Sequence, residues 1–238
     1  MERVQKVIAE CGYCSRRSAE KLILQGKVKV NGKVVLELGT KVSKGDSIEV
    51  EGVVIDNNKN YEYYLLYKPR GVVSTTSDDK GRKCVVDLID TTTRIYPVGR
   101  LDYDTTGVLI LTNDGKLANK LMKPNSEIDK TYIAKVEGIL TGYDIKRLRK
   151  GIIIDGKKTS NAIVKLKNIS KEKQTSLVEI IIHEGKNHQV KKMIEAVGKK
   201  VIKLKRERYA FLDLKGLKAG EYRRLSNKEV AILYSLVK

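Results

Sequence analysis

The chain has 238 residues, enough for one large domain or for a small domain joined to a medium one, with a buried core in either case. Its 48 Lys and Arg outnumber its 29 Asp and Glu, for a net charge of +19. No apolar run approaches the ~20 residues that span a bilayer, which excludes a transmembrane helix. The charge favours a polyanionic partner such as nucleic acid. The alternative is that genomic bias enriches the chain in lysine and that many of these lysines only solvate the surface.

Residues 1–52 predict a small module of two helices and a hairpin. Apolar residues recur at spacings of three and four in 2–11 and again in 15–26, where Ser15 can cap the second helix. An Asn31-Gly32 pair between alternating valines is typical of a type I′ turn. Basic residues occupy the start and outer side of the second helix, where its dipole adds to their attraction for phosphate: Arg16, Arg17 and Lys21.

The cysteines indicate a reducing compartment. Cys11, Cys14 and Cys84 are an odd number in a chain with no signal-peptide pattern, so we expect reduced thiols and a cytoplasmic protein. Cys11 and Cys14 form a lone C-x-x-C without a second pair, and no histidine lies near them in the sequence. A structural zinc site would lack its usual ligands.

Polar residues 53–60 have no apolar periodicity and predict a linker, which leaves 61–238 as a second domain. The central stretch of that domain is 99–115. Its apolar run 108–111 is bounded by Gly107 and a turn-rich segment, which predicts a strand buried on both faces. The preceding polar loop carries Asp102 and Asp104. Catalytic groups often occupy such loops, but loop aspartates also commonly cap turns.

Further elements follow in order around this strand. Alternation places Tyr132 on one face with Ala134 and Val136, and a later helix buries a stripe that leaves Lys191 on its flank. The predicted elements are strands at 63–67, from 130, at 160–169 and at 175–183, and helices at 116–122, at 143–152, from 189 and at 228–238. Thirteen Lys and Arg against four acidic residues give 186–224 a net charge of +9 in 39 positions, the strongest basic field of the chain.

Several separated stretches resemble one enzyme family. Residues 1–52, with Ser-Arg-Arg before Gly-Lys-Val-Lys-Val-Asn-Gly, resemble the S4 RNA-binding domain. The motifs at 68–71, 99–107, 130–132 and 184–193 resemble those of the pseudouridine synthases that modify ribosomal RNA. The resemblance implies an α+β protein: a small S4 (α-L) domain, followed by a catalytic domain with a mixed, mainly antiparallel sheet flanked by helices.

The resemblance also implies roles for residues. Asp102 matches the catalytic nucleophile, Tyr132 the tyrosine that stacks on the target base, and Lys191 the basic partner of the nucleophile. Lysine here replaces an arginine of the family's motif, which keeps the charge but loses the bidentate fork. Arg100 is the family's candidate for filling the space that the flipped base vacates, with a phosphate contact as the alternative. The other expected substrate contacts are Leu204, Lys68, Asn187 and Gln189, together with Arg16, Arg17 and Lys21.

The implied reaction isomerises uridine to pseudouridine and needs no metal or other cofactor. The C-terminal stretches 209–212 and 220–223 resemble the large-subunit branch of the family, which favours 23S over 16S rRNA as substrate. A monomer would suffice. Two alternatives are a non-catalytic S4-type RNA-binding assembly factor and an S4-linked methyltransferase, the latter disfavoured because no glycine-rich cofactor turn follows a strand.

Overall fold

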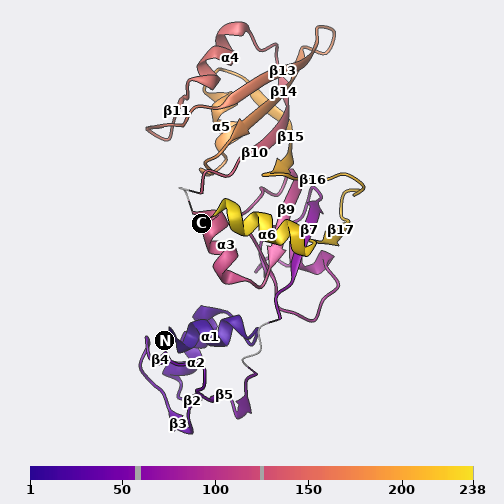
Figure 1. Ribbon diagram of the computed structural model, residues 1–238. Coiled ribbons are helices and arrows are strands. Elements are labelled where there is room, and N and C mark those ends of the chain that lie inside the picture. The colour runs from indigo at the N-terminus through magenta and orange to yellow at the C-terminus, as the bar shows by residue number, and fades with distance from the viewer. Residues whose placement is uncertain (57–59, 124–125, 238) are drawn as a thin grey trace. The chain divides into compact units, whose positions relative to one another are not determined.

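A computed structural model describes residues 1–56, 60–123 and 126–237 (Figure 1). The chain divides into two compact units. The first comprises Met1–Glu62 with the short segments Thr91–Ile95 and Thr112–Gly115, and the second comprises Tyr63–Asp90, Tyr96–Leu111 and Lys116–Lys238.

The first unit contains the predicted helices and hairpin. Its elements are β1 (Glu2–Arg3), α1 (Val4–Glu10), α2 (Arg16–Leu24), β2 (Val28–Val30), β3 (Lys33–Val34), β4 (Lys41–Val42), β5 (Ile48–Val50) and β6 (Val53–Val54). Ser15 caps α2, because its hydroxyl accepts a hydrogen bond from the backbone N–H of Ser18 at 3.0 Å. Asn31 and Gly32 have φ of 51° and 77°, as the predicted type I′ turn requires.

The sheet of this unit has the order β3-β2-β5-β6. Apolar side chains of both helices and of β2, β4 and β5 form one buried core. Val53 and Val54 pair with β5, so the first two residues of the predicted linker belong to this sheet. Residues 57–59 of that linker lie outside the described residues.

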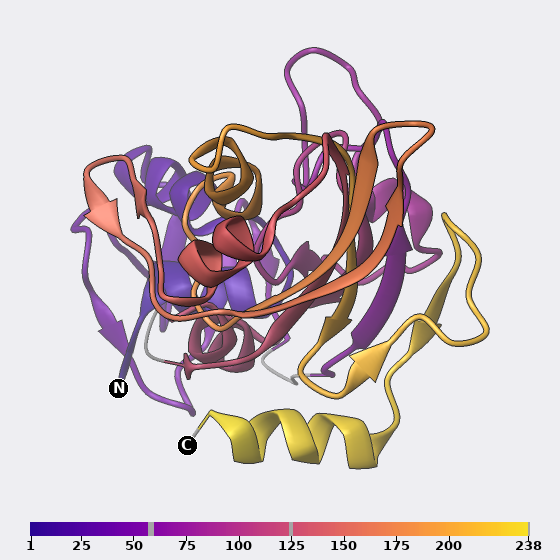
Figure 2. The same ribbon diagram turned by 90° about the horizontal axis from the view of Figure 1, so that it is seen from above.

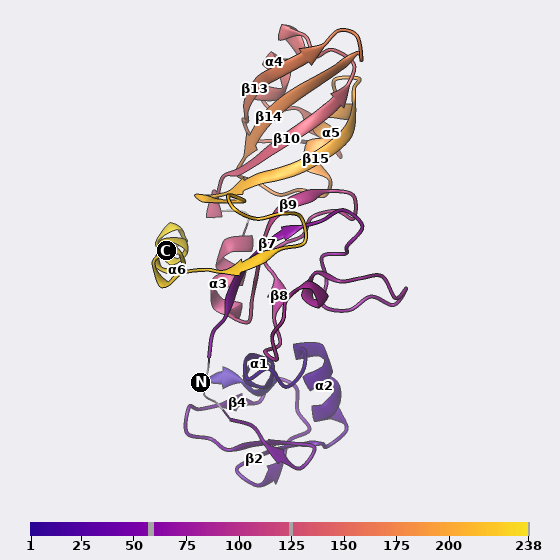
Figure 3. The same cartoon turned by 90° about the vertical axis from the view of Figure 1, so that its right-hand side faces the viewer.

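The second unit is built on a nine-stranded sheet with the main order β13-β14-β10-β15-β9-β7-β17 (Figures 1 and 3). The strands are β7 (Tyr63–Lys68), β8 (Tyr96–Pro97), β9 (Thr106–Thr112), β10 (Lys130–Glu137), β13 (Ile163–Ser170), β14 (Thr175–Ile182), β15 (Lys200–Tyr209), β16 (Leu212–Asp213) and β17 (Tyr222–Arg224). β15 and β9 run parallel, whereas β10, β13, β14, β16 and β17 pair antiparallel with their partners. The expected mixed, mainly antiparallel sheet is confirmed.

Helices cover this sheet and close two apolar cores. They are the 3-10 helix η1 (Val85–Leu88), α3 (Gly115–Met122), α4 (Gly142–Arg149), α5 (Gln189–Glu195) and α6 (Asn227–Leu236), and β11 (Ile153–Ile154) pairs separately with β12 (Lys157–Lys158). Helices α4 and α5 lie on one side of the β13-β14-β10-β15 strands (Figure 2) and share a core with them. Helices α3 and α6 share a second core with β7 and β9.

β9 is the predicted strand with two buried faces, since Gly107 through Thr112 are all buried. It pairs with β15 through Thr106–Lys205 and Gly107–Arg206. Gly107 has φ of 121°, and a Cβ there would lie 2.2 Å from the carbonyl oxygen of Arg206. Glycine is therefore required where loop 99–105, which carries Asp102 and Asp104, enters the sheet.

Candidate active site

The loop that carries Asp102 is held by the segment that follows β7. The hydroxyl of buried Ser74 donates to the carbonyl oxygen of Leu101 at 2.8 Å and accepts from its N–H at 3.1 Å. The N–H of Gly71 donates to the carbonyl oxygen of Tyr103 at 2.8 Å. Both residues that flank Asp102 are thus tied to one neighbouring segment, which limits the movement of the carboxylate between them.

Lys68 holds the end of the same loop. Its ammonium is fully buried and donates to the carbonyl oxygens of Thr105 and Pro69, both at 3.0 Å. Burial lowers the pKa of Lys68 to about 8, against the opposing attraction of Asp102 and Asp104. The sequence predicts a substrate contact for Lys68, but the contacts that the structure gives it are with the protein backbone.

Lys191 joins the two acidic residues of the loop. Its Nζ lies 2.9 Å from Oδ2 of Asp102 and 2.7 Å from Oδ1 of Asp104. Helix α5 presents Lys191 from beside the buried stripe, and its side chain is only 20% exposed. The structure therefore brings together the pair that the sequence places 89 positions apart as nucleophile and partner.

This arrangement favours the charged forms of Lys191 and Asp104. Partial burial disfavours the ammonium of Lys191, but its hydrogen bonds to Asp104 and Asp102 outweigh burial and raise its pKa above the usual lysine value. The hydrogen bond from Lys191 lowers the pKa of Asp104, against the opposite effect of burial. The ammonium of Lys191 thus lies against the carboxyl groups of both Asp102 and Asp104.

His188 is a site residue that the sequence analysis does not select. Its Nε2 lies 3.3 Å from Oδ1 of Asp102. His188 directly precedes α5 and has φ of 53° and ψ of 29°, a left-handed conformation that is unusual for histidine. The sequence offers one signal for it, an ionisable side chain three residues before Lys191. The local sequence does not reveal which side chain His188 contacts in the fold.

Gln189 organises the turn before α5. Its side chain is 4% exposed; the amide nitrogen donates to Oε1 of Glu184 at 2.5 Å, and the amide oxygen accepts from the N–H of Lys186 at 2.9 Å. Those contacts are with protein, although the sequence predicts a substrate contact. Asn187 in the same turn is exposed.

Tyr132 lies on β10, which is separated by β15 from β9, the strand that follows the Asp102 loop. It pairs with Arg206 of β15, and Arg206 pairs with Gly107 of β9, so the three residues form one row across the sheet. At about 4.8 Å per strand, the backbone of Tyr132 is roughly 10 Å from the start of β9. Its ring packs against the core beneath α5. Leu204 is buried, and its carbonyl oxygen lies 3.5 Å from Oγ1 of Thr106.

Contacts around the buried side chain of Arg206 support this row from within the sheet. Arg206 is 3% exposed, donates from Nε to the carbonyl oxygen of Val108 at 2.8 Å, and places its guanidinium 5.4 Å from the ring centre of Tyr209. Burial raises the pKa of Tyr209 to about 12, against the opposing effect of Arg206. The Nζ of Lys130 lies 5.8 Å from the same ring centre. These contacts fix β15 beside both β9 and β10.

Comparison with known families fits both units. Residues 62–196 match the family model described as RNA pseudouridylate synthase, and residues 2–48 match the S4 domain. This chain belongs to the RNA pseudouridylate synthase family.

Whole-length relatives agree with that membership. Ribosomal large subunit pseudouridine synthase B of Bacillus subtilis (strain 168) is 56% identical to this synthase over 99% of the chain and 97% of the relative. An uncharacterized RNA pseudouridine synthase of Aquifex aeolicus (strain VF5) is 40% identical over 99% of the chain and 94% of the relative. A crystal structure of a pseudouridylate synthase matches with a TM-score of 0.68 and 32% identity, over 98% of this chain and 100% of that one. The expected enzyme class and α+β fold are confirmed.

The remaining predicted contact residues of the synthase are accessible. Arg100 is exposed two positions before Asp102. In the S4 unit, the basic residues of α2 are also exposed: Arg16, Arg17 and Lys21. Exposed cations of this kind are available to phosphate groups. Within the described residues, no helix has the length and apolar character needed to cross a membrane.

Proposed function

We propose that this synthase isomerises a uridine of large-subunit ribosomal RNA, with Asp102 as the nucleophile. The observation that carries the assignment is the contact of Asp102 with Lys191 at 2.9 Å, on a loop held by Ser74 and Gly71. The 56% identity to a large subunit synthase supports 23S over 16S rRNA as the substrate class.

The geometry suits the chemistry of the isomerisation. The C1′–N1 bond of uridine must break, the base must rotate, and a C1′–C5 bond must form while a proton leaves C5 and N1 becomes protonated. The carboxylate of Asp102, in contact with the ammonium of Lys191, provides the nucleophile, which adds either to the sugar or to the pyrimidine ring. Lys191 is held in its charged form by Asp104 as well as by Asp102.

We assign supporting roles to residues around Asp102. The target base must leave its stack at a cost of roughly a few kcal/mol. The aromatic ring of Tyr132 stacks on the flipped base, and Leu204 packs beside it. Arg100, exposed ahead of Asp102, occupies the space that the base vacates or contacts a phosphate, and Asn187 contacts the substrate from the turn before α5. Lys68 and Gln189 serve by holding the loops, because their polar groups already bind protein.

We further propose a division of labour between 1–52, which binds RNA, and 61–238, which catalyses, joined by 53–60. The S4 match over 2–48 and the exposed cations of α2 support the first part. Asp102 and Lys191 come from one chain, so a monomer is sufficient. Its three cysteines carry thiols, as suits action in the cytoplasm.

The decisive experiment is tritium release from [5-³H]uridine-labelled 23S and 16S rRNA, without added cofactor. We expect release from 23S rRNA by the wild type and none by Asp102→Asn, with RNA affinity within a few-fold because one charge adds little to a field of +19. Asp104→Asn, the matched control, removes a second acid from Lys191 and should retain release to within about tenfold.

Each other outcome has a defined meaning. Release from 16S rRNA alone would reassign the substrate to the small subunit. Turnover near the wild-type rate in Asp102→Asn would remove Asp102 from the mechanism. RNA binding without release from either rRNA, or from partly assembled subunits, would support the non-catalytic assembly factor instead.

A further inference from the structure

Lys191 covers only one oxygen of the Asp102 carboxylate. Its single Nζ lies 2.9 Å from Oδ2 of Asp102 while it also lies 2.7 Å from Oδ1 of Asp104. An ammonium is one nitrogen on a flexible stem, so it cannot span both oxygens of a carboxylate as a guanidinium does. Contact at Oδ2 alone leaves the carboxylate free to rotate about its Cβ–Cγ bond.

The second oxygen meets His188. Its Nε2 lies 3.3 Å from Oδ1 of Asp102, whereas the hydroxyl of Thr105 approaches Oδ2 at 3.5 Å, the oxygen that Lys191 already covers. In the part of the chain that the structure describes, His188 is thus the side chain found on Oδ1. Two side chains from one turn of chain, those of His188 and Lys191, therefore contact the two oxygens separately.

The backbone of His188 is held in a conformation that histidine does not favour. The left-handed conformation is unfavourable for residues other than glycine. The turn is nevertheless maintained by the buried amide of Gln189, which binds Glu184 and the backbone of Lys186. Strain of this kind persists where the surrounding structure imposes it and often accompanies function. In this turn, the imidazole of His188 lies beside Asp102.

We propose that His188 is a positioning residue, which orients the nucleophilic carboxylate by occupying the oxygen that Lys191 cannot reach. The proposal rests on Asp102 being the nucleophile. With both oxygens held, the carboxylate presents one attacking geometry to the flipped uridine, and less orientational freedom is lost in reaching the transition state.

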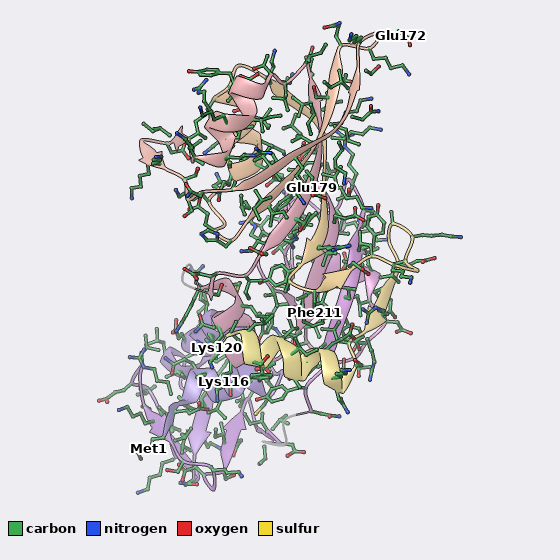
Figure 4. All side chains as sticks on the ribbon, turned by 45° about the horizontal axis from the view of Figure 1, so that its top comes forward. Met1, Lys116, Lys120, Glu172, Glu179 and Phe211 are labelled. Atoms are coloured by element: carbon green, nitrogen blue, oxygen red, sulfur yellow. The ribbon has the colours of Figure 1, made fainter. Side chains whose placement is uncertain are left out.

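His188→Gly tests the side chain apart from the backbone. Glycine accepts a left-handed φ without strain, so this variant should fold at least as stably as the wild type and bind RNA within a few-fold. We expect its single-turnover rate at saturating RNA to fall by about tenfold to a hundredfold, with little change in KM. The matched control is Gln174→Gly, which relieves a similar φ of 46° in the exposed β13–β14 turn and should keep full activity. Glu172 marks the tip of that hairpin in Figure 4.

Lys191→Arg should compensate for the loss of the His188 side chain. A guanidinium at 191 has a fork that can reach both oxygens of Asp102, so His188 should matter less. In the K191R background, we expect His188→Gly to slow turnover by less than about threefold, which makes the two substitutions strongly non-additive.

The outcomes separate this proposal from the function on which it rests. An equal loss in both backgrounds, or a wild-type rate for His188→Gly, would overturn the role of His188 while Asp102→Asn remained inactive. An active Asp102→Asn would instead overturn the nucleophile itself. Reduced stability of His188→Gly in chemical unfolding, with its activity restored by lower temperature, would assign His188 a purely structural role and also reject the proposal.

Discussion

At the scale of one residue, a single buried hydroxyl, that of Ser74, shows how closely the loop of Asp102 is held. Ser74 bonds both the N–H and the C=O of Leu101, the residue before Asp102. Neither bond touches the carboxylate. Both nevertheless fix the backbone from which Asp102 projects, and a displacement of about 1 Å at a reacting group can cost a factor of 10² in rate.

Ser74→Ala should therefore slow turnover more than it weakens RNA binding. We expect kcat to fall by roughly tenfold or more, because Leu101 loses both partners, and the free energy of unfolding to fall by about 1–2 kcal/mol. Single-turnover tritium release and urea unfolding measure the two effects. Ser77→Ala, an exposed position in the same segment, is the control and should change neither. A wild-type rate for Ser74→Ala would show that the loop keeps its geometry without this hydroxyl.

At the scale of an element, the junction between β9 and β15 depends on Gly107. Gly107→Ala would place a Cβ 2.2 Å from the carbonyl oxygen and 2.6 Å from the nitrogen of Arg206, both backbone atoms, at a φ of 121°. We expect a loss of about 3 kcal/mol or more in unfolding free energy and loss of activity. Thermal unfolding and tritium release provide the measurements.

Gly142→Ala is the matched control for that substitution. Gly142 begins α4, and no atom lies within 4 Å of where its Cβ would be. Alanine there should be neutral or stabilise by up to about 1 kcal/mol, with activity unchanged. If Gly107→Ala were no more disruptive than this control, β15 would have room to move away from β9, and the close approach would not be essential.

The same scale shows what could be predicted from sequence. The long elements followed from periodicity: β9 from its unbroken apolar run and α5 from the buried stripe around Val190. The two-residue strands β6, β11 and β16 are not predicted, because their pairing depends on partners and carries no period. The predicted helix at 143–152 ends at Arg149, since Gly151, with φ of 78°, cannot extend it without strain.

The site divides in a similar way. Asp102 and Lys191 could be located from motifs, and their contact is observed. Ser74 and His188 could not, because each acts through contact with a residue of another segment, and a lone Ser or His has no local signature. The motif around Lys68 does not reveal the environment of its side chain. The sequence shows a basic turn, whereas the structure shows a fully buried ammonium.

At the scale of the whole molecule, charge governs the hold on RNA. The S4 unit contributes exposed cations on α2, and the proposed function makes these a phosphate-binding surface. Removing them should act on affinity and not on chemistry, since Asp102 and Lys191 belong to the other unit.

The triple substitution Arg16→Ala, Arg17→Ala, Lys21→Ala tests this separation. We expect affinity for 23S rRNA to fall by about tenfold or more and the slope of log K against log salt to decrease by about 2, with kcat at saturating RNA unchanged. Filter binding at several salt concentrations and single-turnover assays give both quantities. The charge-matched control replaces Lys33, Lys41 and Lys44, which are exposed elsewhere in the same unit, by alanine. An equal loss in the two triples would mean that total charge matters and that α2 has no special place.

Because β9 pairs with a strand that lies far along the sequence, β15, the parts of the protein become complete in a fixed order during synthesis of the chain. The S4 unit is complete, except for two short segments, when the first 62 residues have been made. The loop of Asp102 follows soon after, but Lys191 comes 87 residues beyond Asp104, and β15 comes later still. A nascent chain therefore has its proposed RNA-binding unit well before it has a site in which Asp102 can be oriented. Each molecule acquires the means to hold RNA before the means to modify it.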